Sequence, residues 1–221
     1  MSLIRGAVMV IAKTPVAGRV KTRLCPPLTA EEACEVAWAA LLDTLDAAAA
    51  VPSERHVLVL HGEPGPWIPA GFEIIEQRGV GLAERLANAF TDVNDDAIVV
   101  AMDTPQVRAD QLADSLGSLA DHDAAYGPAT DGGYWLIGLR RSVDPVAAFH
   151  GIPMSTPHTG AAQLARLASL GVTVNSSEAL QDIDTYDDLV AVSAVANSSR
   201  LTTVVRHADL RRALEHSATT V

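Results

Sequence analysis

Two short segments of this chain carry no polar side chain at any position and are bounded by polar or glycine-rich sequence. They cover residues 6–12 and 97–102. A strand with one face in water alternates apolar and polar side chains, whereas a strand covered on both faces is apolar throughout. The two segments therefore predict strands of a mostly parallel sheet that has helices on both faces.

The remaining sequence alternates between helical and strand-like patterns. Thr29 begins the capping box Thr-Ala-Glu-Glu, which predicts a helix that continues to residue 50. Apolar residues with helical spacing predict further helices over residues 82–93, 111–120, 159–170 and 186–196. Apolar or β-branched runs between turn residues predict strands over residues 55–61, 72–77, 124–127, 134–139 and 172–174. Strands and helices in this order indicate a three-layer α/β/α fold.

The length and composition of the chain favour one domain. With 221 residues, of which 48% are hydrophobic, the chain is long enough for one continuous core and short for two. We expect a single domain over residues 1–221, with its core in residues 4–197 and a helical C-terminal tail over residues 198–221. A short basic helix is expected within that tail, over residues 208–216.

The charge balance argues against two classes of partner. The chain has 16 basic and 27 acidic residues, a formal net charge of −11, which repels nucleic acid and anionic membranes. The first apolar segment is too short to span a bilayer and lacks a small-residue cleavage pattern. The two cysteines, Cys25 and Cys34, do not have a metal-binding spacing. We therefore expect a cytoplasmic protein that acts on small molecules.

Basic residues are concentrated in the loop that follows the first predicted strand. Ligands of open α/β sheets bind beyond the carboxyl ends of the strands, and lysine and arginine supply the charge that a polyphosphate requires. The loop lacks the glycine spacing of a Walker or dinucleotide motif, and the alternative is a solvated basic loop. We expect a nucleotide to bind at Lys13, Gly18, Arg19, Lys21, Thr22 and Arg23, with help from Gln77 and Arg85.

Carboxylates follow two other predicted strands. Asp103 comes directly after the second apolar segment, where it could hold Mg²⁺ or Mn²⁺ together with nucleotide phosphates, or only cap the following turn. Asp182 and Asp184 lie on the same side of an extended segment, so either can complete a metal site with Asp103. We expect Asp103 and Asp184 to be the metal ligands, and Asp187 and Asp188 to cap the next helix.

A glycine-rich corner separates two of the later predicted strands. Its Asp-Gly-Gly sequence allows a tight backbone corner beside a ligand, and it is equally an ordinary hairpin turn. Asp131 can accept hydrogen bonds from hydroxyl groups, and Tyr134 or Trp135 could face a ring. The residues expected to bind the acceptor are Thr130, Asp131, Gly132, Gly133 and Tyr134.

Five motifs occur in order between residues 7 and 190. They are Lys-Thr-Pro-x-x-Gly-x-x-Lys-Thr-Arg-Leu, Gln-x-Gly-x-x-Leu-x-x-Arg-Leu, Asp-Thr-Pro, Pro-Ala-x-Asp-Gly-Gly-Tyr-x-Leu-x-Gly-Leu and Asp-x-Asp-Thr-x-x-Asp-Leu. The ordered set resembles a bacterial family of GT-A-like transferases encoded beside radical-SAM and selenium-associated genes, in the nucleotide-diphospho-sugar transferase superfamily. The first and last motifs are also similar to those of 2-phospholactate guanylyltransferases. The chain departs from the pattern at Ala101 and Met102, where Gly-Ser is usual.

The resemblance has consequences for both fold and site. It implies a GT-A-like fold, with Asp103 and Asp184 as the metal carboxylates and residues 13–23 as the phosphate-binding loop. It also implies a monomer or a homodimer.

Three functions are compatible with these residues. The favoured one is metal-dependent nucleotidyl transfer, in which a phosphorylated small molecule attacks a nucleoside triphosphate and pyrophosphate leaves, while Lys21 and Arg23 hold the β- and γ-phosphates. The alternative is glycosyl transfer from a nucleotide-diphosphate sugar, with Asp131 holding or deprotonating the acceptor. The third is a nucleotide-binding module that has lost catalysis. Lys21, Asp103 and Asp131 are the expected catalytic residues.

Overall fold

The computed structural model describes residues 3–196 and 200–209 of the chain, in which strands and helices alternate. The strands are β1 (Ile4–Lys13), β2 (Ser53–His61), β3 (Phe72–Glu76), β4 (Ala97–Ala101), β5 (Ala124–Pro128), β6 (Tyr134–Leu139) and β7 (Val174–Ser176). The α-helices are α1 (Ala30–Ala49), α2 (Gly81–Val93), α3 (Ala109–Gly117), α4 (Pro145–Phe149), α5 (Thr159–Ser169) and α6 (Tyr186–Val195), and the 3-10 turns are η1 (Thr22–Leu24) and η2 (Ser118–Ala120). Residues 200–209 are also helical.

The described strands form one mixed sheet in the order β3-β2-β1-β4-β6-β5-β7. Val10 of β1 pairs with Leu58 of β2 on one side and with Val100 of β4 on the other, both in parallel. Strand β6 is antiparallel to its neighbours β4 and β5, and the other pairs are parallel, so the prediction of a mostly parallel sheet is confirmed. Because β1, β2 and β4 run in the same direction, the loops that follow them meet at one edge of the sheet.

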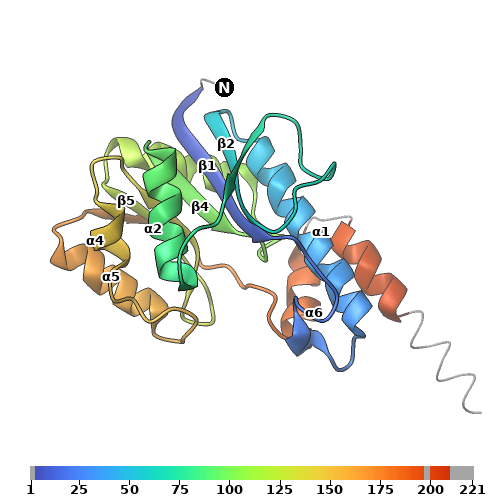
Figure 1. Cartoon of the computed structure of the whole chain (residues 1–221). Helices are drawn as coiled ribbons and strands as arrows, with labels where there is room; N and C mark the ends of the chain where they lie inside the picture. Colours follow the sequence, from blue (N-terminus) through green and yellow to red (C-terminus); the bar gives the residue numbers. More distant parts are fainter. Residues whose placement is uncertain (1–2, 197–199, 210–221) are drawn as a thin grey trace, which may run out of the picture.

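Helices cover both faces of the sheet. Val8 and Val10 of β1 belong to a core cluster with residues of α1 and α3, whereas Ala7 and Met9 belong to a second cluster with residues of α2, α4 and α5. Figure 1 shows α2, α4 and α5 on one side of the strands and α1 on the other. These four β1 side chains are fully buried, which explains why the segment has no polar position. The predicted three-layer α/β/α fold is confirmed.

A third apolar cluster connects the loop after β1 with the end of the described chain. Leu24 of η1, Val36 of α1, Leu189 of α6 and Leu201 of the last helix are each at most 1% exposed. Figure 1 accordingly shows α6 and the helix at residues 200–209 beside α1. This cluster packs η1, at the end of the loop after β1, against α1 and α6. Most of the basic helix predicted over residues 208–216 lies outside the described residues.

The predicted caps are present, and two of the differences between predicted and observed bounds have a clear structural reason. The Thr29 hydroxyl accepts a hydrogen bond from the Glu32 N–H at 3.2 Å, and Asp188 completes a capping box at the start of α6. The helix predicted over residues 111–120 is α3 followed by η2, because the last turn tightens. The strand predicted over residues 172–174 is β7, which starts later because the Val172 N–H still donates to the end of α5. Within the described residues, no helix is long and apolar enough to cross a membrane.

Candidate functional site

The loop between β1 and η1 brings its basic side chains to the carboxyl edge of the sheet. Val20 and Leu24 are buried and hold the loop against the core. The Arg19 N–H donates to the Val16 carbonyl at 2.9 Å, which closes a turn in the loop. Lys21, directly before η1, has a left-handed backbone conformation with φ 48° and ψ 36°. This conformation is uncommon for a residue with a Cβ atom, so the surrounding contacts must hold it in place.

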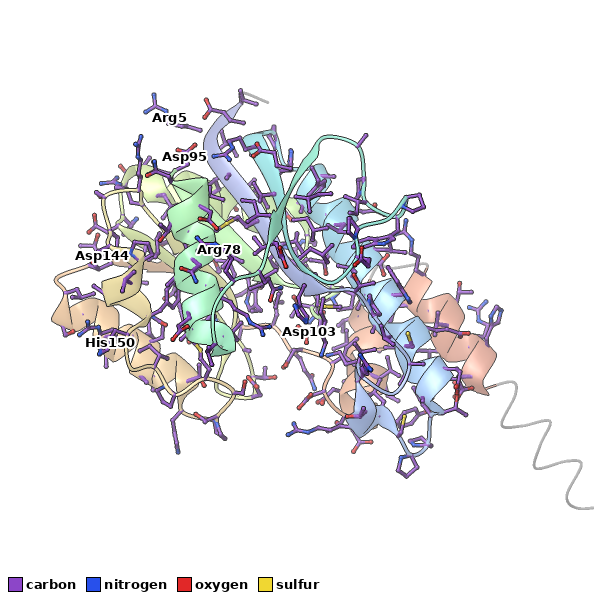
Figure 2. All side chains as sticks on the ribbon, viewed as in Figure 1. Arg5, Arg78, Asp95, Asp103, Asp144 and His150 are labelled. Carbon is purple, nitrogen blue, oxygen red and sulfur yellow. The ribbon has the colours of Figure 1, made fainter. Side chains whose placement is uncertain are left out.

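The basic side chains line a pocket of about 250 Å³. Its lining includes Lys13, Arg19, Lys21, Thr22 and Arg23 of the loop, together with Met102, Asp103 and Asp184. Figure 2 shows Asp103 near the middle of the molecule, between α2 and α1. Most of the residues predicted from the first motif to bind nucleotide therefore share one pocket with the two carboxylates predicted to bind metal.

Lys21 is bonded to the end of β4. Its Nζ donates to Asp103 Oδ2 at 2.8 Å and also to the carbonyl oxygen of Ile183. The Lys21 side chain is 9% exposed, and that of Asp103 is 30% exposed. The Ile183 N–H donates to the Asp103 carbonyl oxygen at 3.2 Å, so the segment before α6 is held at the same place. Three segments that are far apart in the sequence therefore meet at Asp103.

The two carboxylates that precede α6 have different partners. Asp184 forms an ion pair with Arg23, in which the aspartate side chain is 47% exposed and the arginine 74%. Asp182 is partly buried: burial, and then the neighbouring carboxylates of Asp103 and Asp131, raise its pKa to about 6. Asp103 and Asp131 therefore lie near enough to Asp182 to raise its pKa, and Asp184 lies beside the basic loop.

The carboxylate oxygens of Asp103, Asp182 and Asp184 have the chemistry that a hard divalent cation prefers. Carboxylate oxygens suit Mg²⁺ and Mn²⁺, and Mg²⁺ usually keeps waters and substrate phosphates in its coordination shell. Among residues 3–196 and 200–209, no group of three or more His, Cys, Asp or Glu side chains is arranged to hold a metal ion by itself. An ion at Asp103 would therefore depend on few protein ligands and on phosphate oxygens.

Gln77 and Arg85 make contacts within the fold. Gln77 Nε2 donates to the carbonyl oxygens of Ala12 at 2.7 Å and Val59 at 3.0 Å, near the ends of β1 and β2. Its Oε1 accepts from Arg85 Nη1 at 3.3 Å. Neither side chain lines the pocket of the basic loop. Their contact with a nucleotide stays a prediction, to which the structure adds a role in holding two strand ends.

The Asp-Gly-Gly corner is a tight turn between β5 and β6, as the hairpin interpretation predicts. Asp131 Oδ1 accepts from the Gly133 N–H at 2.8 Å. Gly132 has φ +91°, and a Cβ atom there would lie 2.1 Å from the carbonyl oxygen of Pro157. Glycine is therefore required at this position for both conformation and space. The same turn places the Asp131 carboxylate close enough to Asp182 to affect its pKa.

The two aromatic residues after this corner face the interior. Trp135 is 1% exposed, and its Nε1 donates to the Glu178 carbonyl at 3.1 Å. The Tyr134 hydroxyl contacts Met154 Sδ at 3.6 Å, and burial raises the pKa of Tyr134. The expectation that Trp135 could face a ligand ring is wrong, because β6 is covered on both faces and a large apolar side chain there packs into the core. Of the residues expected to bind the acceptor, Thr130 and Asp131 are exposed.

Two residues at the site were not predicted from the sequence: Met102, and Asp182, which was only the alternative to Asp184. Met102 lines the pocket, and its Sδ accepts from the Lys13 N–H at 3.4 Å; its position directly before Asp103 was the available signal. The alternation of Asp182 and Asp184 in the sequence does not distinguish one from the other. The contacts of the folded segment distinguish them.

Comparison with known proteins identifies similar chains. Phosphoenolpyruvate guanylyltransferase of Mycolicibacterium vanbaalenii is 29% identical over 188 residues, which cover 78% of this chain and 83% of that protein. A solved structure from Desulfovibrio desulfuricans G20, described as a candidate nucleotide-diphospho-sugar transferase, has a TM-score of 0.82 at 25% identity and covers 92% of this chain and 95% of its own. A manganese complex of a Mycobacterium tuberculosis H37Rv protein is similar in fold, with a TM-score of 0.50 at 19% identity over 87% of this chain and 98% of its own.

These comparisons confirm the resemblance to GT-A-like nucleotide-diphospho-sugar transferases and to guanylyltransferases that the ordered motifs indicated. A family model also matches residues 34–156, which is more than half of the chain. The matched region includes β4 with Asp103 and the turn that carries Asp131. The chain therefore belongs to the family described as uncharacterized protein conserved in bacteria (DUF2064).

Proposed function

We propose that this chain is a metal-dependent nucleotidyltransferase that transfers the nucleotidyl group of a nucleoside triphosphate to a phosphorylated small molecule and releases pyrophosphate. The broader class, a nucleotide-dependent transferase, is that of the Mycolicibacterium vanbaalenii guanylyltransferase. The observation that carries the proposal is the pocket in which the basic loop after β1 meets Asp103 at the end of β4.

The basic loop supplies the charge that a polyphosphate needs. Lys13 Nζ donates to the Arg19 carbonyl at 3.4 Å, and within the described residues no carboxylate forms an ion pair with Lys13 or Arg19. In a chain with a net charge of −11, exposed cations without carboxylate partners favour an anionic ligand at this edge. Lys21 and Arg23 add two further cations to the same pocket.

For the metal we propose the pair Asp103 and Asp182, in place of the pair Asp103 and Asp184 expected from the sequence. Burial and the charge of Asp103 both act on Asp182, whereas Asp184 is paired with Arg23. A bound Mg²⁺ or Mn²⁺ would neutralise part of the charge on the phosphates. The Mycobacterium tuberculosis protein of similar fold is itself a manganese complex.

The groups of the chain would act mainly by position and charge. An oxygen of the acceptor phosphate attacks the α-phosphorus, the bond from that phosphorus to the bridging oxygen breaks, and pyrophosphate leaves with the bonding electrons. Lys21 and Arg23, together with Lys13 and Arg19, hold the departing phosphates, which favours the transition state because negative charge accumulates on them. Thr130 and Asp131, exposed on the turn between β5 and β6, are available to bind the acceptor.

Glycosyl transfer from a nucleotide-diphosphate sugar is the second candidate. The TM-score of 0.82 with the Desulfovibrio desulfuricans protein favours it. In that reaction Asp131 would hold or deprotonate the acceptor hydroxyl. A pocket lined by Lys13, Arg19, Lys21 and Arg23 suits a triphosphate better than a diphosphate, and we place glycosyl transfer second for that reason. A nucleotide-binding module without catalysis is the third candidate.

Thermal unfolding with each nucleoside triphosphate and each nucleotide sugar, with and without Mg²⁺ or Mn²⁺, separates these candidates. A ligand at about 100 times its Kd adds about 2.7 kcal/mol to the unfolding free energy, which raises Tm by about 5 to 11 °C in a domain of this size. Metal-dependent stabilisation by one triphosphate, with pyrophosphate release when phosphorylated acceptors are added, supports nucleotidyl transfer. A response confined to one nucleotide sugar supports glycosyl transfer. Binding without turnover of either donor supports the module.

A matched pair of substitutions tests the choice of metal carboxylate. Asp182→Asn should abolish the metal-dependent part of the stabilisation by nucleotide, as should Asp103→Asn. Asp184→Asn makes the same chemical change two positions away and should leave that part intact. The opposite result, with loss in D184N and retention in D182N, would restore the pair expected from the sequence.

A further inference from the structure

The ammonium group of Lys21 lies among the carboxylates of the candidate site. Lys21 Nζ is 2.8 Å from Asp103 Oδ2 and also donates to the carbonyl of Ile183, the residue between Asp182 and Asp184. The Lys21 amino group therefore neutralises part of the charge of Asp103, which is the role of a bound cation.

The fold holds Lys21 in this position. Its backbone is left-handed with φ 48°, and the neighbouring Val20 and Leu24 are 3% and 0% exposed. The Lys21 side chain is 9% exposed, whereas Lys13, in the same pocket, is an exposed residue. A surface ion pair between mobile side chains has none of these constraints. The contact between Lys21 and Asp103 is therefore a built feature of the site.

On the basis of the proposed function, we propose that Lys21 is the resident counter-ion of the metal site and competes with the divalent cation for Asp103 Oδ2. The metal reaches its full affinity only when nucleotide phosphates offer the Lys21 ammonium another partner. Free metal therefore binds weakly, and metal and nucleotide bind tightly together.

The physical reason is repulsion between two cations at one oxygen. A Mg²⁺ ion held by this oxygen would lie about 2.0 to 2.1 Å from it, and Lys21 Nζ lies 2.8 Å from the same oxygen, so the two positive charges would be within about 5 Å. A triphosphate brings several negative oxygens into the pocket, which gives Lys21 an alternative partner. Because coupling free energies are reciprocal, nucleotide and metal must then raise each other's affinity by the same factor.

The composition of the chain supplies a matched control for this proposal. Lys13 and Lys21 are the two lysines of the chain, and both line the pocket. Lys13 Nζ donates to a backbone carbonyl, whereas Lys21 Nζ donates to Asp103. Lys13→Gln and Lys21→Gln each remove one positive charge from the same pocket, so both variants share any general effect of lost charge. Only Lys21→Gln also removes the contact with Asp103.

The first experiment measures binding of Mn²⁺ alone by electron paramagnetic resonance, without nucleotide. Lys21→Gln should bind Mn²⁺ about tenfold more tightly than the native chain, and Lys13→Gln should gain less than about threefold. Equal or weaker binding by K21Q would overturn the proposal, as would an equal gain in K13Q. Adding Asp103→Asn to K21Q should remove the gain, and a retained gain would place the ion elsewhere and also overturn it.

A second measurement uses the native chain and does not depend on how a variant folds. Labelling with ¹⁵N-lysine gives one side-chain amino signal each for Lys13 and Lys21. Addition of Mg²⁺ with a non-hydrolysable triphosphate analogue should move the Lys21 signal and speed its proton exchange with water relative to Mg²⁺ alone. An unchanged Lys21 environment despite metal binding would refute competition. If no triphosphate were turned over, the proposed reaction would be refuted. The comparison of Mn²⁺ binding by K21Q and K13Q would still test the role of Lys21, because it needs no turnover.

Discussion

Replacing Gln77 with methionine removes a polar side chain that joins the ends of β1 and β2. Methionine has a similar length and cannot donate to the carbonyl oxygens of Ala12 and Val59, which Gln77 Nε2 contacts at 2.7 and 3.0 Å. Each lost hydrogen bond is worth about 1 kcal/mol, so Gln77→Met should lower the unfolding free energy by about 2 kcal/mol. For a domain of this size the corresponding fall in Tm is about 4 to 8 °C.

The control is the same substitution at a second glutamine. Gln163 is fully buried, its Nε2 donates to the Ala148 carbonyl at 2.9 Å, and its Oε1 has no partner within the described residues. Gln163→Met loses one hydrogen bond but also removes an unpaired buried acceptor, so we expect a change of less than about 1 kcal/mol.

Urea unfolding followed by circular dichroism measures both variants. A smaller loss of stability in Q77M than in Q163M would refute the assigned role of the Gln77 contacts. Nucleotide titration of folded Q77M adds a second readout. A large loss of affinity there would mean that Gln77 contacts the nucleotide directly, as the sequence motif predicts, in addition to its contacts within the fold.

Three further predictions concern local conformation and charge. Gly132→Ala should lower the unfolding free energy, measured in urea, by about 2 to 4 kcal/mol, because the new Cβ would meet a carbonyl oxygen. Gly18 also has a positive φ, +75°, but has open space around it, so Gly18→Ala should cost only about 1 kcal/mol. Equal costs would contradict the role of the close contact at Gly132. Asn94 ends α2 with φ 49°, so Asn94→Ala should lose about 1 kcal/mol and Asn94→Gly should not. A bidentate bond from Arg55 lowers the pKa of Glu73, so its contribution is present at neutral pH and lost as the pH falls through that lowered pKa. The stability difference between the native chain and Glu73→Gln should therefore vanish in acid, and a constant difference would argue against the ion pair.

The order of strands and helices was largely predictable from the sequence. The apolar segments at residues 6–12 and 97–102 indicated buried parallel strands because a strand covered on both faces has no solvent-facing position. The Thr29 capping box marked the start of α1 because its hydrogen bonds are made between residues three apart. Both signals are local, so neither required knowledge of the rest of the fold.

The general location of the site was also accessible from the sequence. Parallel strands place their carboxyl ends at one edge, so the basic loop after β1 and Asp103 after β4 had to lie near each other once both strands were recognised. The direction of β6 was not accessible in this way, because an apolar segment fits a parallel or an antiparallel neighbour equally well. Trp135 is buried because it packs in a core cluster with residues of α1 and α3, which cover that face of the sheet.

By itself the sequence determined the periodicity of the elements, the caps and the residue types available at the sheet edge, because these depend on neighbours along the chain. The tertiary structure alone decided the partners of the charged side chains. Lys21 bonds to Ile183, 162 residues away, and Arg23 bonds to Asp184, 161 residues away. Contacts over such separations fix the direction of each side chain in an irregular loop, and no local pattern in the sequence specifies them.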